Sequence, residues 1–600
     1  MSEWVSACVV AQTGRSNDGI YVLQCKISTM QMLAWRVALV TLLVSVVCVD
    51  GEEATVEQGE NGTLFMNGTG DGGKVLFNGI DVLSELKTAK ERGRSEEAAL
   101  NLLAASLLTV AAEAGVDNAA VLEPANPGIQ ITVDGSGNVN MENYKGLSMF
   151  SFGVLRAVPG TINLINNPEL TSVNFGLVTV VEGDVQLDNS GLTAVDFRSI
   201  TSISGGLTAS SSNLTSVRFG ELRSIGKQLD LTRNPLQTLN LGKITHIGTS
   251  LNLHNCELAS FHFGALTSIG FDINLQENLL TELHFSHLPA VPRNLWAYGN
   301  VITSVDFGDL TEIGGFLDLS GNQLTAINLG NLSTVHGTIN LRNNKLTALS
   351  LEPLAFLGGN VQIIRNELTS VDFGNLTTIF GDISLASNEL TTLSLGKVQS
   401  VGGSILAPSN HLVSVEFGEV THVNGRISLS NNDLSFVDFG KVTNAGDGID
   451  LARNELTGVN FRDMVTVGFE INLEYNGLTA VDLRNISSVS GPLVFNNNKL
   501  TRVVFGDLNL VEGDVVLDNN ELTSIAFGRV SSMGGVSLHG NDLVAVNFTG
   551  VTAIGADIVL TGNPRLTSVD CRGLGACLCA DATLTQRNDC PSRCGRVECF

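Results

Sequence analysis

The chain has 600 residues, a formal net charge of -26, only 16% charged residues and 64 glycines. Phosphate binding needs a basic stripe, so this acidic composition argues against nucleic acid as a partner, and against an anionic membrane surface. Few charges and many glycines favour short strands joined by tight corners.

The N-terminal segment has the features of a secretion signal. An apolar run from Val37 to Val49 has the length of a signal-peptide core and is short for a membrane span. We interpret residues 30–50 as a signal peptide that starts at Met30 or Met32, and residues 1–29 as an extension of the gene model. The alternative is an uncleaved signal anchor. After cleavage we expect no membrane span.

Residues 51–130 form a separate N-terminal region. Within it, residues 80–115 have the pattern of a helix, with Ser95 as an N-cap, two glutamates in the following turn and Gly115 as a stop. We expect this helix to cover the first coil of the repeat that follows. An oligomerisation helix is the alternative.

Residues 131–570 are a repeat. Leucine recurs every 22 residues from Leu170 to Leu522, and Ile302 takes the one position that lacks it. An asparagine stands two residues before many of these positions: Asn234, Asn278, Asn300, Asn322, Asn344, Asn366, Asn388, Asn410, Asn432, Asn454, Asn476, Asn498 and Asn520. Because a fixed period of this length is typical of stacked coils, we predict a mainly β solenoid of about twenty coils.

One coil shows how the pattern works. Ile383 and Leu385 alternate with polar residues, as in a short strand with one buried face. Asn388 follows at a position where an inward amide can bond the backbone of its own coil and of the next. Gly396 makes a corner before a third apolar segment. A column that is mostly phenylalanine, with leucine in the gaps, is predicted to form a buried spine.

The segment Ile383-Ser-Leu-Ala-Ser-Asn388-Glu-Leu390 resembles a leucine-rich repeat, with its L-x-L-x-x-N-x-L core. The phrase from Leu368 to Ile379 also resembles the receptor L-domain type of right-handed β-helix. Both resemblances imply a right-handed solenoid that binds a partner outside the cell or at its surface. The chain departs from receptor kinases in having no cytoplasmic catalytic domain, and its coils lack a helix-length convex segment.

Residues 571–600 are rich in cysteine. An even cluster in an exported chain predicts disulfides, here in a cap over the last coil; zinc is the alternative, but two matched C-x-x-C arms are missing. The cluster comprises Cys571, Cys577, Cys579, Cys590, Cys594 and Cys599. Cys256, by contrast, occupies an asparagine position of the repeat and is predicted to be buried.

Secreted chains are glycosylated at N-x-[ST] sequences. We expect the acceptors at Asn61, Asn67, Asn331, Asn375, Asn485 and Asn547.

The sequence contains no motif of an enzyme, and we expect neither catalysis nor a cofactor. His262 and His284 share an outward column on adjacent coils with Asp306. Three such groups could hold a metal. Because the column otherwise has no regular composition, we interpret them as solvated side chains and expect no metal site. A column of threonines raises the alternative of ice binding, but its partner positions vary.

The candidate binding site is a group of outward residues on the first strand of neighbouring coils. Exposed aromatic and arginine side chains are typical binding anchors, and amides beside an aromatic ring suit sugar recognition. The group comprises Trp296, Tyr298, His254, Asn274, Gln276 and Arg342. Pro289 and Pro292 make the coil of Trp296 irregular, so the alternative is that Trp296 turns inward to fill a gap.

These observations predict a secreted or cell-surface solenoid that binds an extracellular protein or glycan through one sheet face. The alternative is a structural spacer or adhesive matrix protein without a discrete ligand site.

Overall fold

The computed structural model describes residues 136–153, 155–571 and 574. It also describes the backbone of six short strands outside them: β1 (Thr55–Gln58), β2 (Leu64–Asn67), β3 (Leu76–Phe77), β4 (Ile80–Asp81), β5 (Thr132–Val133) and β64 (Val597–Glu598). The predicted signal peptide, residues 30–50, lies outside the described residues. The described residues contain no helix, and so none long and apolar enough to cross a membrane.

The N-terminal region contains two antiparallel strand pairs, β1 with β2 and β3 with β4. Ile80 and Asp81 are therefore in a strand, and the predicted helix does not begin at residue 80. The remainder of that predicted helix lies outside the described residues.

From Val139 onward the chain forms a parallel β-solenoid of twenty stacked coils, which confirms the predicted architecture. Each coil has three sides, because two short polar or glycine-containing corners separate its three strands. The first side is one continuous parallel sheet. Its strands are β6 (Val139–Asn140), β9 (Ile162–Asn163), β12 (Val185–Gln186), β15 (Leu207–Thr208), β18 (Leu229–Asp230), β21 (Leu251–Asn252), β24 (Ile273–Asn274), β27 (Leu295–Trp296), β30 (Leu317–Asp318), β32 (Ile339–Asn340), β35 (Val361–Gln362), β38 (Ile383–Ser384), β41 (Ile405–Leu406), β44 (Ile427–Ser428), β47 (Ile449–Asp450), β50 (Ile471–Asn472), β53 (Leu493–Val494), β56 (Val515–Val516), β59 (Val536–Ser537) and β62 (Ile558–Val559).

The second side carries strands of three residues: β7 (Met149–Ser151), β10 (Ser172–Asn174), β13 (Ala194–Asp196), β16 (Ser216–Arg218), β19 (Thr238–Asn240), β22 (Ser260–His262), β25 (Glu282–His284), β28 (Ser304–Asp306), β33 (Ala348–Ser350), β36 (Ser370–Asp372), β39 (Thr392–Ser394), β42 (Ser414–Glu416), β45 (Phe436–Asp438), β48 (Gly458–Asn460), β51 (Ala480–Asp482), β54 (Arg502–Val504), β57 (Ser524–Ala526), β60 (Ala545–Asn547) and β63 (Ser568–Asp570).

The third side carries strands of two residues: β8 (Ala157–Val158), β11 (Val180–Val181), β14 (Ser202–Ile203), β17 (Ser224–Ile225), β20 (His246–Ile247), β23 (Ser268–Ile269), β26 (Ala290–Val291), β29 (Glu312–Ile313), β31 (Thr334–Val335), β34 (Phe356–Leu357), β37 (Thr378–Ile379), β40 (Ser400–Val401), β43 (His422–Val423), β46 (Asn444–Ala445), β49 (Thr466–Val467), β52 (Ser488–Val489), β55 (Leu510–Val511), β58 (Ser532–Met533) and β61 (Ala553–Ile554).

Both ends of the first-side sheet are paired. Strand β5 lies antiparallel to β6, and β64 lies parallel to β62. An open sheet end exposes unpaired backbone groups, and these strands pair with those of β6 and β62. Strand β64 belongs to the cysteine-rich segment, whose disulfide pairing lies outside the described residues. Cys571, the first cysteine of that segment, is buried.

A ladder of buried asparagines ties each coil to the one before it. The Asn388 side chain is 4% exposed. Its Nδ2 donates to the Leu385 carbonyl of its own coil at 2.9 Å and to the Ile363 carbonyl of the preceding coil at 2.8 Å. Its Oδ1 accepts the backbone N–H of Leu368, also in the preceding coil, at 3.1 Å. A buried amide is thus satisfied on both sides, which is the condition for burying it without a large penalty.

The second side is built in pairs of coils, a feature the 22-residue period does not predict. β13 bonds to β16, β19 to β22 and β25 to β28, whereas the described residues show no ladder between one pair and the next. The coil between β28 and β33 has no second-side strand at all. After this unpaired coil the pairing resumes, with β33 bonded to β36. The last three second-side strands, β57, β60 and β63, form one sheet.

The spine residue is phenylalanine in every second coil, whereas a first coil has either phenylalanine or leucine. Phenylalanine occupies the second coils at Phe175, Phe219, Phe263, Phe307, Phe373, Phe417, Phe461, Phe505 and Phe548, and leucine occurs only in first coils and in the unpaired coil, at Leu241, Leu329, Leu351, Leu395 and Leu483. Across the unbonded junctions the rings of Phe263 and Phe285 lie 4.9 Å apart, and those of Phe417 and Phe439 lie 5.2 Å apart. We infer that the ring fills the space at a junction where the second-side strands form no ladder.

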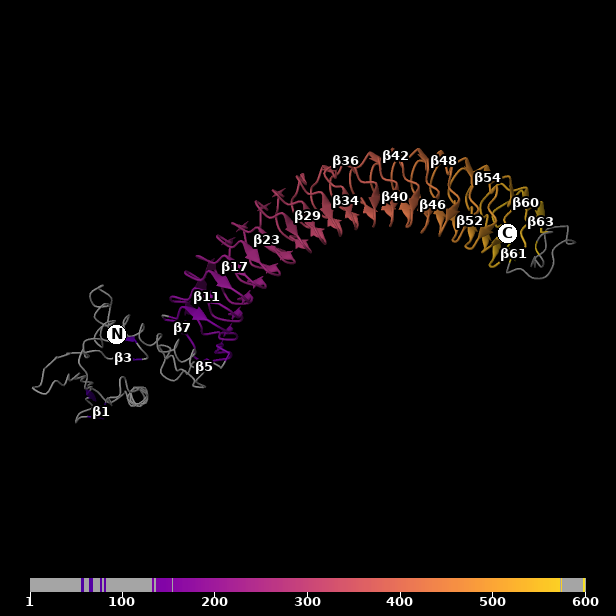
Figure 1. Cartoon of the computed structure of the whole chain (residues 1–600). Coiled ribbons are helices and arrows are strands. Elements are labelled where there is room, and N and C mark those ends of the chain that lie inside the picture. The colour runs from indigo at the N-terminus through magenta and orange to yellow at the C-terminus, as the bar shows by residue number, and fades with distance from the viewer. Residues whose placement is uncertain are drawn as a thin grey trace, which may run out of the picture. The chain divides into compact units, whose positions relative to one another are not determined.

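The solenoid is bowed, with second-side strands such as β36, β42 and β48 on the outer edge of the arc and third-side strands such as β34, β40 and β46 on the inner edge (Figure 1). Hydrogen-bonded strands lie about 4.8 Å apart. A side that lacks every second ladder is longer than one with continuous ladders. We infer that the alternate pairing contributes to the direction of the bow.

The pairing predicts which corner glycines are essential. Gly396 and Gly418 follow the spine residues of the two coils of one pair, at φ 55° and 60°. A Cβ on Gly418 would lie 2.5 Å from the Gly396 carbonyl oxygen, whereas a Cβ on Gly396 would meet nothing within 4 Å. We expect Gly396→Ala to cost about 1 kcal/mol from its backbone conformation alone, and Gly418→Ala to cost about 3 kcal/mol because the overlap is added. Urea unfolding followed by circular dichroism measures both, and equal losses would contradict the pairing.

The asparagine ladder predicts the effect of an isosteric change. Asn388→Asp removes the Nδ2 donor and points a carboxylate at the carbonyl oxygens of Ile363 and Leu385. We expect a loss of more than about 3 kcal/mol at pH 7, which is larger than that of Asn388→Ala. Because this carboxyl would have a raised pKa in the folded chain, stability should recover as the pH falls through that pKa. Urea unfolding from pH 4 to pH 7 tests this; an Asp variant as stable as the Ala variant at pH 7 would contradict it.

Candidate functional site

The candidate site lies on the first-side sheet, and the outward direction of its aromatic residues follows from their neighbours. Leu295 and Ala297 are fully buried, so Trp296 and Tyr298, which alternate with them, face outward and are partly exposed. The alternative that Trp296 turns inward is wrong. Ala297 is the residue that faces the core at this point, and the Trp296 ring is not needed to fill it.

The predicted site residues form two adjacent columns on this face. Trp296 pairs in register with Asn274 on one neighbouring strand and with Asp318 on the other. His254, Gln276 and Tyr298 stand two residues after the first-column positions of three successive coils. Arg342 lies in the same column as Tyr298 but two coils further on, with Ser320 between them. The structure thus brings five of the six predicted residues together and places Arg342 at the margin.

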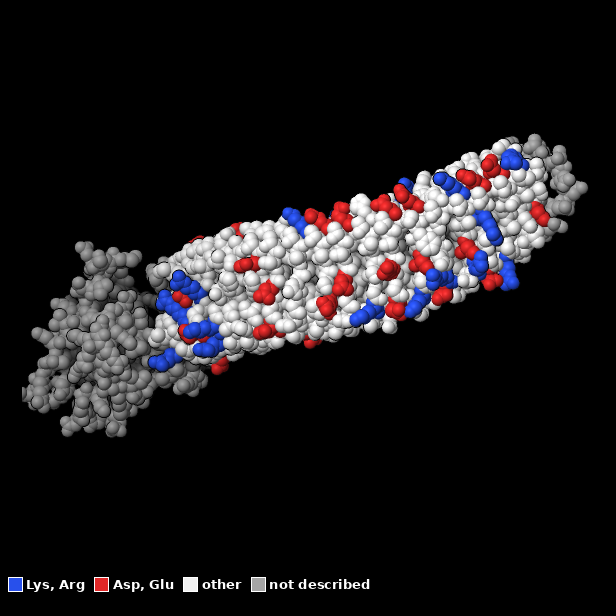
Figure 2. All heavy atoms as spheres, turned by 90° about the horizontal axis from the view of Figure 1, so that it is seen from above, with Lys and Arg blue, Asp and Glu red and all other residues white. Residues whose placement is uncertain are grey.

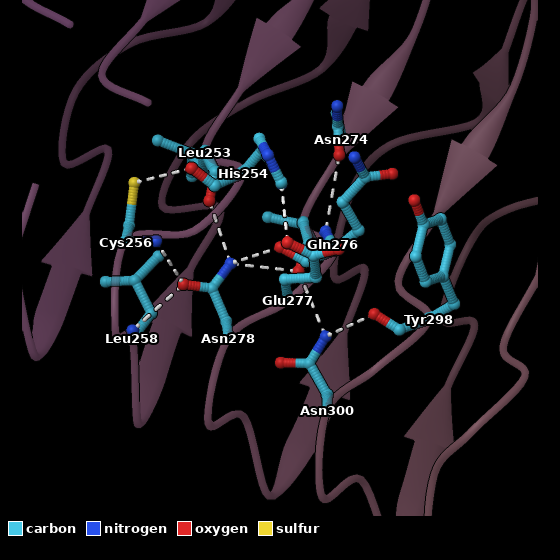
Figure 3. Close-up of polar contacts among 11 residues, drawn as sticks. Leu253, His254, Cys256, Leu258, Asn274, Gln276, Glu277, Asn278, Tyr298 and Asn300 are labelled. Atoms are coloured by element: carbon cyan, nitrogen blue, oxygen red, sulfur yellow. Dashed lines mark hydrogen bonds and ion pairs between the residues drawn. The ribbon is translucent and has the colours of Figure 1, made fainter. Parts of the chain in front are cut away.

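Polar side chains along the first column brace the turn that follows the strand. The Asn274 side-chain oxygen accepts the Gln276 backbone N–H at 3.3 Å, and the Asp318 carboxylate accepts that of Ser320 at 2.9 Å. Figure 3 shows the Asn274 amide nitrogen pointing away from the bond to Gln276. The Trp296 side chain has no oxygen that could accept the backbone N–H of Tyr298. Its coil therefore lacks this hydrogen bond from the first-column side chain and has an aromatic ring at the position.

Two carboxylates set the electrostatics around Tyr298. Partial burial raises the pKa of the Tyr298 hydroxyl, and the negative charges of Glu277 and Asp318 raise that pKa further. The hydroxyl therefore stays protonated at neutral pH and remains a hydrogen-bond donor. His254 lies at the other end of the column, with Nδ1 3.8 Å from a Glu277 carboxylate oxygen. This nitrogen is buried and makes no hydrogen bond.

Behind the site, the asparagine ladder continues through Asn278 and Asn300 (Figure 3). Asn278 Oδ1 accepts the backbone N–H groups of Cys256 and Leu258 at 2.9 and 3.0 Å. Cys256 takes the asparagine position of its own coil, and its Sγ donates to the Leu231 carbonyl of the preceding coil at 3.1 Å. The prediction that Cys256 is a buried coil residue is confirmed.

Sequence reasoning missed one aromatic residue of the face. Phe316 is 50% exposed and lies two residues before Asp318. Leu317 and Leu319 are buried, so Phe316 faces the same way as Asp318 and is a diagonal neighbour of Trp296. Phe316 lies in the corner before the strand, where most coils have glycine or a small polar residue. A large apolar residue at this corner could have indicated from the sequence that Phe316 is exposed.

The metal alternative has no support from the geometry. The described residues contain no group of three side chains placed to hold a metal ion. His284 stands 3.4 Å from Glu282 and 3.6 Å from Asp306, while His262 contacts Ser260 at 3.3 Å.

The threonine column on the second side is partly engaged in holding the coils together. The hydroxyls of Thr303, Thr369 and Thr501 donate to backbone carbonyls of the preceding coil, at 3.2, 3.1 and 3.2 Å. These threonines therefore have a structural role.

Charged side chains are scattered over the face shown in Figure 2, and acidic and basic groups are often adjacent. Several lysines and arginines pair with a carboxylate one coil away, such as Lys243 with Glu221 at 2.6 Å and Lys441 with Glu419 at 2.7 Å. This pattern gives no support to a polyanionic partner.

Four predicted glycosylation sites lie in the solenoid. Asn331, Asn375, Asn485 and Asn547 are all exposed. Asn61 lies outside the described residues, and Asn67 lies in β2, where only the backbone is described.

No protein-family model matches this chain, and no curated protein is similar to it. The assignment to leucine-rich repeats or receptor L-domains therefore depends on the residue pattern alone.

The environment of Cys256 predicts an unreactive thiol. Burial raises the pKa of Cys256 to about 12, above the 9.0 of an ordinary thiol. We expect iodoacetamide at pH 8 to leave Cys256 unmodified in the folded chain and to alkylate it in urea, as measured by mass spectrometry of its peptide. Since the folded pKa exceeds the unfolded one, this thiol should also weaken folding as the pH rises above about 9. Equal alkylation of folded and unfolded chain would contradict its burial.

Proposed function

We propose that this chain is a non-catalytic binding solenoid of the leucine-rich-repeat or receptor L-domain kind, which acts outside the cell or at its surface. The L-x-L-x-x-N-x-L coils support the family assignment, and the asparagines of that pattern occupy the ladder position. The apolar N-terminal run, the exposed sequons and the C-terminal cysteines support export.

The observation that carries the binding proposal is the outward pair Trp296 and Tyr298. A continuous polar sheet has no structural need for two large rings on its outer face, and neither ring fills the core. Rigid aromatic side chains on a fixed scaffold lose little entropy when they bind, so they serve as anchors. The neighbouring amides of Asn274 and Gln276 supply hydrogen bonds to a protein backbone or to sugar hydroxyls.

A second candidate is a spacer or matrix protein. It is favoured by the ladder hydrogen bonds, which tie hydroxyls and amides to neighbouring coils along the whole rod. In that case the aromatic pair would have no ligand.

Substitution of the aromatic pair tests the proposal. In Trp296→Ala with Tyr298→Ala, we expect affinity for the ligand to fall more than about thirtyfold, because even one anchor contributes about 2 kcal/mol. Retention on immobilised glycans and extracellular proteins measures this, with the secreted full-length chain as the parent.

Leu406→Ala is the matched control. Leu406 is a partly exposed residue in the same column, five coils away from Trp296 along the sheet. Its removal should leave retention unchanged. Binding by the parent that survives the double substitution would remove this site, and absence of binding by the parent would favour the spacer.

A further inference from the structure

We propose that the site continues as a strip of exposed rings across five coils, and that the strip binds an uncharged linear polysaccharide. This inference rests on the proposed function and specifies its ligand class. The strip comprises Tyr298, Trp296, Phe316, His336, Phe356 and Phe380.

The rings of the strip follow one another from coil to coil. Phe316 lies one coil after Trp296, diagonally across the sheet from it, and its ring lies over Gly337 of the following coil, where a Cβ would come within 2.5 Å of it. His336 precedes Gly337, and its ring centroid is 5.3 Å from that of Phe356. The Phe356 ring is in turn 5.5 Å from that of Phe380.

The strip is also exposed. Phe316, Phe356 and Phe380 are 50%, 37% and 55% exposed. Phe271, one coil before Trp296, differs in that the Arg293 guanidinium stacks on its ring at 5.0 Å. No such cation is seen over a ring of the strip among the described residues.

The backbone is irregular along the same stretch. The third-side sheet is interrupted between β23 and β26 and again between β34 and β37, which isolates β26, β29, β31 and β34 as a four-stranded sheet. The unpaired second-side coil, between β28 and β33, falls within it. The coils that carry the exposed rings thus depart from the repeat on the second and third sides, which is consistent with a specialised segment.

The shape of the strip argues against a second protein as the occupant. The strip turns a corner, from the first side at Phe316 to the third side at Phe356, so a flat partner surface would cover only part of it.

The chemistry around the strip favours an uncharged polysaccharide. Sugar rings have apolar faces that stack on aromatic rings and hydroxyls that need donors and acceptors at the edges. Acceptors lie beside the strip at Asp318 and Glu312, and an amide at Asn340, which donates to Asp318 at 3.0 Å. Glu312 also holds His336 Nε2 at 3.0 Å. Carboxylates in these positions would repel an anionic polysaccharide.

The test uses affinity electrophoresis of the secreted full-length chain in gels that contain one soluble polysaccharide each. The uncharged probes are laminarin, xyloglucan and galactomannan, and the anionic probes are alginate and heparin. The parent should be retarded by at least one uncharged probe. The Phe316→Ser, Phe380→Ser double variant should bind that probe at least tenfold more weakly.

Phe469→Ser is the matched control, because Phe469 is also 50% exposed and lies at the equivalent corner outside the strip. It should bind within twofold of the parent. Circular dichroism confirms that each variant is folded, and Phe380→Ser alone is used if the double variant is not.

The outcomes separate this inference from the proposed function. If Trp296→Ala with Tyr298→Ala abolishes binding and the double phenylalanine variant does not, the site stands and the strip is refuted. If the phenylalanine variant alone loses binding, Trp296 and Tyr298 are refuted as anchors and only the part of the strip from Phe316 to Phe380 stands. Two results would overturn the proposal of an uncharged polysaccharide ligand. One is retardation by the anionic probes alone, and the other is binding to a protein and to none of the uncharged probes.

Discussion

The structure depends on one repeated interaction, the buried asparagine amide that bonds two coils at once. The Nδ2 group of Asn388, for example, donates to a carbonyl of its own coil and to one of the preceding coil. Its Oδ1 accepts a backbone N–H of the preceding coil. Asn234, Asn278 and Asn388 all donate to a carbonyl of the preceding coil at 2.8 Å. A shift of one coil by a single residue would leave several buried polar groups without partners, so the ladder fixes the register of the whole stack.

The sequence predicted this part of the fold well because the period is strict. Leucine and asparagine positions, the spine and the buried Cys256 follow from repetition and alternation alone. The pairing of coils on the second side was not predicted, although a signal existed in the restriction of spine leucines to first coils and the unpaired coil. A further signal was Arg198, a residue other than glycine at the corner of a first coil with φ 41°. The physical reason lies in backbone contacts between successive corners, which no single coil reveals.

The candidate site could be predicted only in part. Alternation placed Trp296 and Tyr298 on the outer face, because Leu295 and Ala297 must face the core. Phe316, Phe356 and Phe380 could not be assigned together, since they occupy three different positions in their coils. Only the stacking of coils brings them into one strip.

Hydrogen exchange at the ladder amides tests the account most directly. The backbone N–H groups of Leu258, Leu280, Ile302 and Leu324 donate to an asparagine side chain of the next coil at 3.0 Å in every case. We predict that these amides exchange as slowly as those of the buried first-side residues Leu275 and Leu295. Exchange as fast as that of amides in the exposed corners would contradict the ladder and with it the stacked arrangement of the coils.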